Sequence, residues 1–102
     1  MVNIIHIIKK NPEYILKYIN MKEIKNLASE IFEDVDYNNF MKHLKNKNWV
    51  KLRSFVANQI EIKDFIIETI SDDDNRQVLL KELDMLNRLE DILIYELEMN
   101  DA

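Results

Sequence analysis

The sequence predicts an all-α protein, a compact bundle of five or six helices with a long C-terminal helix as its spine. Three observations lead to this class. The 102 residues include no glycine and a single proline, so the residues that most often break or turn a helix are nearly absent. Apolar residues recur at helical spacing in several separate segments. The last third of the chain keeps that spacing over residues 72–99.

The first half of the chain divides into short amphipathic segments. Residues 2–9 are apolar and are expected to form one or two helical turns. Asn11 is expected to cap a helix with Pro12 at its first position, where the missing N–H costs nothing. Residues 22–34 then repeat apolar positions three and four apart, which predicts a second amphipathic helix.

The middle of the chain predicts three more elements. Residues 36–44 read as a helix that Asp36 caps, and the polar stretch 46–48 reads as a break. A helix over 49–59 and another over 63–70 follow. The alternating Ile-Glu-Ile-Lys between them suits a strand, but no second strand pairs with it, so we expect a bend or a continued helix.

The longest predicted helix spans residues 72–99, with Ser71 as its cap and Asp72–Asp74 in its first turn, where the helix dipole favours anions. Its apolar side chains form two neighbouring seams, and a surface helix needs only one. We therefore expect it to be the centre of the bundle or to give one seam to another subunit. The residues of the predicted interface are Leu79, Leu86 and Leu93 on one seam and Val78, Met85 and Ile92 on the other.

A homodimer or a docked partner helix would cover the extra seam, and the competing expectation is that Ile4 to Ile8 fold back over it. Glu82, Glu90 and Glu96 interrupt the seams. Because charges are rarely buried unpaired, we expect them at the rim or opposite lysines of an interface.

Composition excludes most catalytic chemistry. Without glycine the chain cannot build a glycine-rich phosphate cradle or a nucleophile elbow, although AT-rich coding also explains part of the glycine gap. Without cysteine it has no disulfide or thiolate chemistry. His6 and His43 have no carboxylate or second histidine at helical ligand spacing. We therefore predict no catalytic residue and no cofactor.

Two carboxylate pairs offer an enzymatic alternative. Glu30 with Glu33, and Glu61 with Asp64, each lie three residues apart on a helix, and oxygen ligands at that spacing suit magnesium. At these four positions the pattern resembles the all-α nucleotide pyrophosphohydrolases, which implies a magnesium-dependent nucleotide hydrolase. In that family a further acidic residue doubles the first pair, and Ser29 occupies its place here.

A basic segment over residues 42–53 offers a nucleic-acid alternative. Positive side chains around an exposed aromatic ring suit phosphate contact and base stacking. The other reading is an ordinary solvated surface, with the tryptophan packed under a loop. The residues concerned are Lys42, Lys45, Lys47, Trp49, Lys51 and Arg53.

Charge is divided unevenly between the halves of the chain. Residues 1–60 hold ten Lys/Arg and six Asp/Glu, whereas residues 61–102 hold four Lys/Arg and thirteen Asp/Glu. The two halves can neutralise each other within one bundle, or the acidic half can dock on a basic partner.

The leading functional prediction is a single helical domain, residues 1–102, that binds another macromolecule, most often a protein, as regulators, immunity factors and viral or phage antagonists do. No apolar run approaches the ~18 residues of a membrane span, so we expect no membrane partner. The N-terminal MVNIIHIIKK lacks the basic leader of a signal peptide. We expect a cytoplasmic location, in a microbe or in a host cell.

Overall fold

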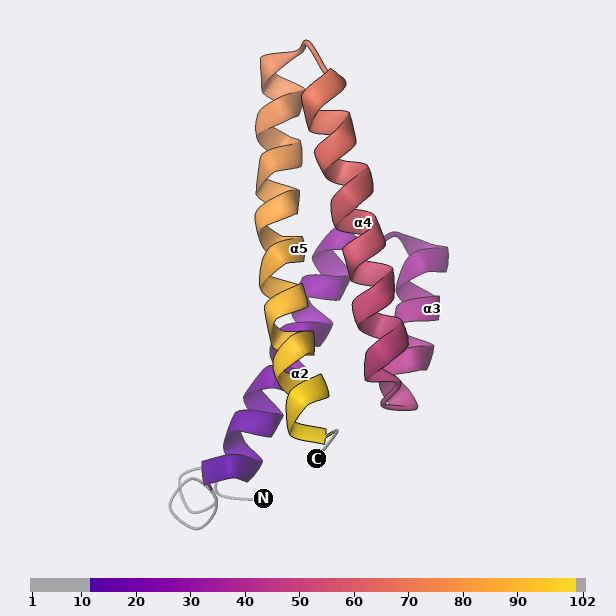
Figure 1. Cartoon of the computed structure of the whole chain (residues 1–102), viewed down its shortest axis with the longest axis vertical. Coiled ribbons are helices and arrows are strands. Elements are labelled where there is room, and N and C mark those ends of the chain that lie inside the picture. The colour runs from indigo at the N-terminus through magenta and orange to yellow at the C-terminus, as the bar shows by residue number, and fades with distance from the viewer. Residues whose placement is uncertain (1–11, 101–102) are drawn as a thin grey trace.

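The computed structural model describes residues 12–100, which form four helices and no strand. Helix α2 spans Pro12–Ile31, α3 spans Asp34–Lys45, α4 spans Trp49–Thr69 and α5 spans Asp73–Asn100 (Figure 1). The predicted all-α class and the long C-terminal helix are therefore confirmed. The predicted number of five or six helices is not matched, and the predicted segment 2–9 and cap Asn11 lie outside the described residues.

The smaller number of helices arises because α2 and α4 are each continuous where two helices were counted, and at residues 60–63 a continued helix was one of the two expected alternatives. Helix α2 continues through Asn20 and Met21, and α4 continues through residues 60–63. Neither stretch contains glycine or proline, so nothing in the backbone forces a break. In the second stretch Ile60 and Lys63 are three residues apart, and Lys63 pairs with Glu82 of α5. The helical period thus directs both side chains toward α5, whereas a strand would alternate them.

The turn between α3 and α4 lies where the sequence predicts it, at residues 46–48. Lys47 takes the left-handed conformation, with φ of 54°. Asn48 caps α4, since its side-chain oxygen accepts a hydrogen bond from the backbone N–H of Lys51 at 3.4 Å. Helix α3 begins at Asp34, two residues before the predicted start, so Asp36 lies in its first turn instead of capping it.

The turn between α4 and α5 is held by Asp72 and Arg76. Asp72, not the predicted Ser71, caps α5, because its carboxylate accepts the backbone N–H of Asp74 at 3.0 Å. The Arg76 guanidinium reaches back and donates to the carbonyl oxygen of Ile70. This pairing ties the first turn of α5 to the end of α4.

Helices α4 and α5 form an antiparallel hairpin along the long axis of a molecule that measures 52 × 25 × 24 Å. Helix α2 packs on α5, α3 packs on α4, and α2 and α3 contact each other. Both lie beside only one half of the hairpin, the half that contains the start of α4 and the end of α5 (Figure 1). The other half projects beyond them.

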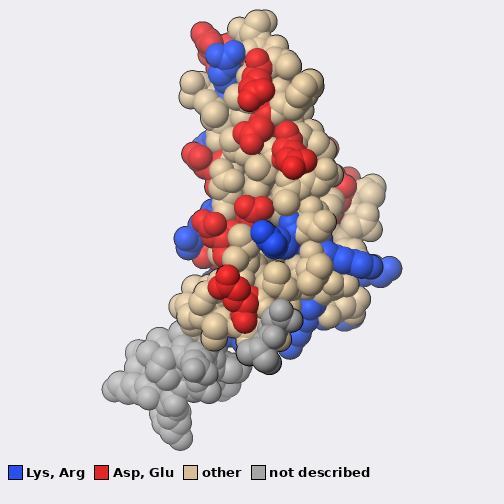
Figure 2. Space-filling model, in the orientation of Figure 1, with Lys and Arg blue, Asp and Glu red and all other residues tan. Residues whose placement is uncertain are grey.

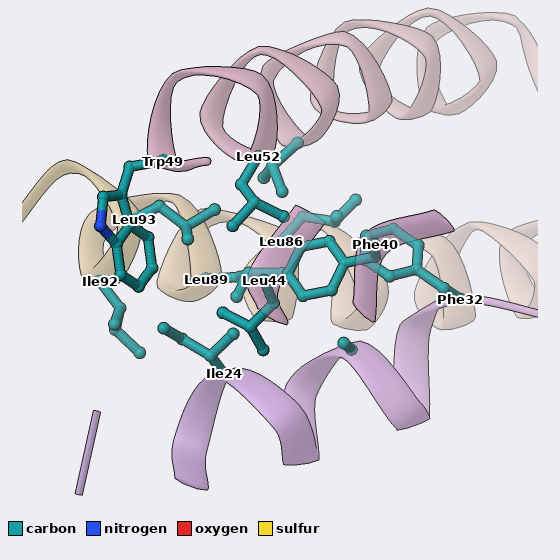
Figure 3. Close-up of a cluster of buried hydrophobic side chains, with 12 residues drawn as sticks. Ile24, Phe32, Phe40, Leu44, Trp49, Leu52, Leu86, Leu89, Ile92 and Leu93 are labelled. Atoms are coloured by element: carbon teal, nitrogen blue, oxygen red, sulfur yellow. The ribbon is translucent and has the colours of Figure 1, made fainter. Parts of the chain in front are cut away.

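The core lies entirely in the covered half. Phe32 joins its parts, since its ring centroid lies 5.3 Å from that of Phe40 and 5.2 Å from that of Phe55. No buried hydrophobic residue of the described chain falls between residues 57 and 85. The buried hydrophobic residues, most of which Figure 3 labels, are Ile24, Ala28, Phe32, Phe40, Leu44, Trp49, Leu52, Val56, Leu86, Leu89, Ile92 and Leu93.

Two substitutions on α5 test whether the core is confined to the covered half of the hairpin. Leu86→Ala is expected to lower the free energy of unfolding by about 2–5 kcal/mol, because it opens a cavity in a fully buried position. Val78→Ala, at a mostly exposed position two turns earlier, is expected to cost less than about 0.5 kcal/mol. Urea unfolding followed by circular dichroism measures both. Equal losses would contradict a core confined to one half of the hairpin.

Candidate functional site

The structure places the predicted interface residues of α5 in two groups. Leu86, Leu93 and Ile92 are buried within the chain. They belong to the half of the hairpin that α2 and α3 cover. Leu79 and Met85 are half-buried, and Val78 is 58% exposed. Both seams are therefore closed at one end by the chain's own helices and are more open at the other. Binding of a second chain stays a prediction, and residues Ile4 to Ile8 lie outside the described part.

The projecting half of the hairpin, residues 60–85, is called the distal hairpin here. It exposes five large apolar side chains, of which Leu80 lies on another side of α5 and the other four are considered together: Ile62, Phe65 and Ile66 on α4, and Val78 on α5. We call these four residues the distal face. Phe65 is the most open of them, with 67% of its surface exposed. The three residues of α4 were not among the predicted interface residues, although the run Phe65-Ile66-Ile67 carries more apolar residues than one helical stripe can bury.

On α4, the distal face continues a stripe that is covered further down the helix. Phe55 packs against Phe32, near the end of α2. Ile62 lies seven residues, or two helical turns, after Phe55, and Ile66 lies one turn further. Ile62 and Ile66 therefore lie on the side of α4 that is covered in the other half of the hairpin. Phe65, three residues after Ile62, lies at the edge of this stripe, since Asn58 and Glu61, the residues on its own row in the two preceding turns, are exposed.

On α5 the same reasoning applies to Val78. It lies two turns before Met85 and four turns before Ile92, which belongs to the buried core. Val78 thus lies on the stripe that is buried nearer the C-terminus. The two stripes face the same side of the hairpin, because α2 packs on α5, α3 packs on α4, and α2 and α3 contact each other.

Two polar contacts show why α2 does not reach the distal face. Asn20 donates to Glu96 at 3.1 Å, and Glu23 accepts from Arg88 at 2.7 Å, so α2 runs antiparallel to α5 in this register. Helix α2 ends at Ile31, eight residues after Glu23. Counted residue for residue along both helices, Ile31 falls opposite Leu80 from the Glu23–Arg88 pair and opposite Met85 from the Asn20–Glu96 pair, so by either count α2 ends short of Val78.

Acidic residues surround the distal face. Residues 60–85 contain eight acidic and three basic residues. Glu61 and Glu68 lie one turn before and one turn after Phe65, and Asp74 lies one turn before Val78. Of the three basic residues, Arg76 holds the turn and Lys63 pairs with Glu82. Figure 2, which shows one side of the molecule, has several acidic patches and a basic patch among other side chains on the projecting half.

Lys81 is the exposed cation beside this face, three residues after Val78. The Lys63–Glu82 pair lies at the seam between the two helices, with about a third of the Glu82 side chain exposed. Glu82 thus meets a lysine of its own chain. The distal face is therefore an apolar surface with a mainly acidic border.

Of the three glutamates that interrupt the seams of α5, Glu96 differs most from the prediction, which placed them at the rim of the seams or opposite lysines of an interface. It is 2% exposed, and both of its carboxylate oxygens accept hydrogen bonds. Asn20 of α2 donates to one oxygen at 3.1 Å, and Asn100 of α5 donates to the other at 3.2 Å. Nearby, the hydrogen bond to Glu23 raises the pKa of Arg88 above its ordinary value. These contacts set the register between α2 and α5.

Asn20→Asp tests the role of Glu96 in this register. It replaces a donor with a second carboxylate beside a buried one, so we expect the free energy of unfolding to fall by about 1–3 kcal/mol at neutral pH. Asn26→Asp is the matched control, because it makes the same change at an exposed position of α2. Denaturant unfolding measures both, and equal stability of the two variants would contradict the role.

The basic segment surrounds the α3–α4 turn. Its five cationic side chains are exposed, at the end of α3, in the turn and at the start of α4. Trp49, in contrast, is only 6% exposed and belongs to the core beside Ile92 and Leu93 (Figure 3). Its indole is not free to stack on a base, so only the phosphate contacts of the nucleic-acid alternative keep exposed side chains.

Trp49 reports directly on this question because it is the single tryptophan of the chain. We expect its fluorescence to be blue-shifted, weakly quenched by acrylamide and unchanged by single-stranded DNA at low salt. Quenching of the emission by DNA would contradict a purely structural role for the ring. In that case Lys45→Glu with Lys47→Glu, and added salt, should weaken the binding.

The two carboxylate pairs are exposed on separate helices. Glu33 lies in the turn after α2, Glu30 lies on α2, and Glu61 and Asp64 lie on α4. Within residues 12–100, no three His, Cys, Asp or Glu side chains gather in an arrangement that could hold a metal ion. The geometry therefore adds no support to the magnesium alternative.

Comparison with known proteins finds no family model that matches the chain, no matching curated protein and no matching solved structure. Among the described helices, none combines the length and the apolar character needed to cross a membrane. A function of this chain is therefore proposed from the geometry of the chain itself.

Proposed function

We propose that this protein acts by binding another protein through the distal face of its α4–α5 hairpin. The observation that carries the proposal is the exposure of Ile62, Ile66 and Val78 on stripes that are covered in the other half of the hairpin, with Phe65 exposed at the edge of the α4 stripe. Clustered exposed apolar residues with a polar border are typical of protein-binding surfaces. A regulator, an immunity factor or an antagonist of a host protein acts in this way without catalytic residues.

The energetic argument rests on the cost of leaving these side chains in water. Transfer of a large apolar side chain from water to a packed interface contributes roughly 1.5–3 kcal/mol. Phe65 and Val78 are each more than half exposed, so most of that gain is still available to a partner. Aromatic residues often contribute a large share of the affinity of an interface, and Phe65 is both the one aromatic residue of the distal face and its most exposed member, which makes it the expected anchor.

The charges around the distal face favour a different protein over a second copy of this chain. Two copies meeting through this face would bring Glu61, Glu68 and Asp74 of one chain near those of the other. Like charges across an interface oppose binding. A homodimer remains the competing assembly, and sedimentation equilibrium at micromolar concentration distinguishes it from a monomer.

A matched pair of variants tests the proposal by affinity capture from the native cells. Phe65→Asp places a charge in the distal face, and Val50→Asp makes a comparable change at an equally exposed residue near the other end of α4. We expect wild type and Val50→Asp to retain the same proteins, identified by mass spectrometry, and Phe65→Asp to lose them.

Circular dichroism controls for folding, since neither exposed position should cost more than about 0.5 kcal/mol. Proteins that all three baits retain, or that only Val50→Asp loses, would place binding elsewhere and contradict the proposal.

A further inference from the structure

We infer that the segment bound by the distal face is an amphipathic helix with Lys or Arg along the borders of its apolar side. This inference rests on the proposed function and specifies its partner. It combines two features of the distal hairpin: the uncovered stripes that α2 and α3 cover elsewhere, and the acidic residues beside them.

The helical shape of the partner follows from the covered half of the same hairpin. There α2, a helix, packs on α5 across the stripe that contains Leu89 and Ile92. Because side chains on a helix repeat at fixed spacing, the ridges and grooves of that surface continue past Ile31 toward Val78. A surface that accepts a helix in one half therefore offers similar ridges and grooves to a helix in the other half.

The basic character of the partner follows from the border. Glu61 and Glu68 lie along the α4 edge next to Phe65, and Asp74 lies on the α5 edge next to Val78, where Lys81 is the one exposed exception. A helix that places leucines against Phe65 brings the flanking side chains of its apolar stripe near these carboxylates. Lysine or arginine at those positions is attracted, and glutamate is repelled.

The test uses the whole chain and three synthetic helical peptides of about four turns. The first has a leucine stripe with lysines on both borders. The second replaces those lysines with glutamates, and the third is a scramble of the first that keeps its composition and charge. Fluorescence anisotropy of labelled peptide at low salt measures the dissociation constants.

We expect the first peptide to bind at least about tenfold more tightly than either of the others, because affinity requires both the stripe and the charges. Phe65→Asp is expected to raise its dissociation constant by about tenfold or more. Val50→Asp, the matched control, should leave it unchanged.

Charge reversal tests the border separately. The triple variant Glu61→Lys, Glu68→Lys, Asp74→Lys is expected to weaken the lysine peptide about tenfold and to bind the glutamate peptide instead. The control reverses three exposed acids outside the distal face, as Glu30→Lys, Asp91→Lys, Glu98→Lys. It has the same net charge as the first triple variant and should keep the preference for the lysine peptide.

Four outcomes would overturn the inference. If the scrambled peptide binds as tightly as the first peptide, the attraction depends on net charge alone. If both triple variants lose affinity for the lysine peptide to the same extent, the conclusion is again that net charge alone attracts it. A dimer in sedimentation that Phe65→Asp dissociates assigns the face to a second copy of this chain. Capture of native partners that depends on Phe65, with no binding of the lysine peptide, overturns the basic helix while the proposed function stands.

Discussion

The two helices of the hairpin reach further than the helices that pack on them, and the rest of the structure follows from this mismatch. Helix α5 has 28 residues and α4 has 21, whereas α3 has only 12. Helix α2 has 20 residues, but it is shifted toward the C-terminal end of α5. The covering layer therefore closes one half of the hairpin. All the buried hydrophobic residues of the described chain gather there, and the other half depends on contacts between its own two helices.

Specific polar contacts, in addition to apolar packing, fix the position of α2 along α5. Apolar stripes alone permit a helix to slide by one turn, because the next turn presents similar residues. Glu96 removes that freedom, since its buried carboxylate needs the amides of Asn20 and Asn100. A shift of α2 by one turn would separate Asn20 from Glu96 and leave a buried charge with one fewer donor, which is costly. The register that leaves the distal face uncovered is thus the one that satisfies Glu96.

The sequence patterns predicted the helices better than they predicted which helices pack against one another. The helical class, the break at residues 46–48 and the long last helix follow from local spacing and turn residues, which act within a few positions along the chain. The continuity of α2 was not predicted, and that of α4 was one of two alternatives, because the alternation at residues 60–63 suits either a strand or the edge of a helix. Contact with α5 selects the helix there, and that contact is not local.

Prediction of the candidate site was also limited by contacts that are not local in the sequence. The excess of apolar residues on α5 was visible in the sequence, and it correctly indicated more surface than one neighbour covers. The part that remains exposed depends on where α2 and α3 end relative to the hairpin, so Leu86, Ile92 and Leu93 became core while Val78 did not. Trp49 likewise changed from a candidate stacking residue to a core residue, because the helix after the turn directs it toward α5.

A hairpin that is half core and half open surface has consequences for its own stability. The distal hairpin has half-buried apolar contacts, the capped turn at Asp72 and the Lys63–Glu82 pair, but no fully buried hydrophobic side chain among residues 57–85. Segments with so little burial open locally at a lower free energy than the core. A partner that covers Phe65 and Val78 would add the missing apolar contacts and stabilise the segment through its binding energy. The uncovered apolar surface that weakens this half of the molecule is therefore also the surface that a partner can stabilise, and α2 and α3 both end before they cover it.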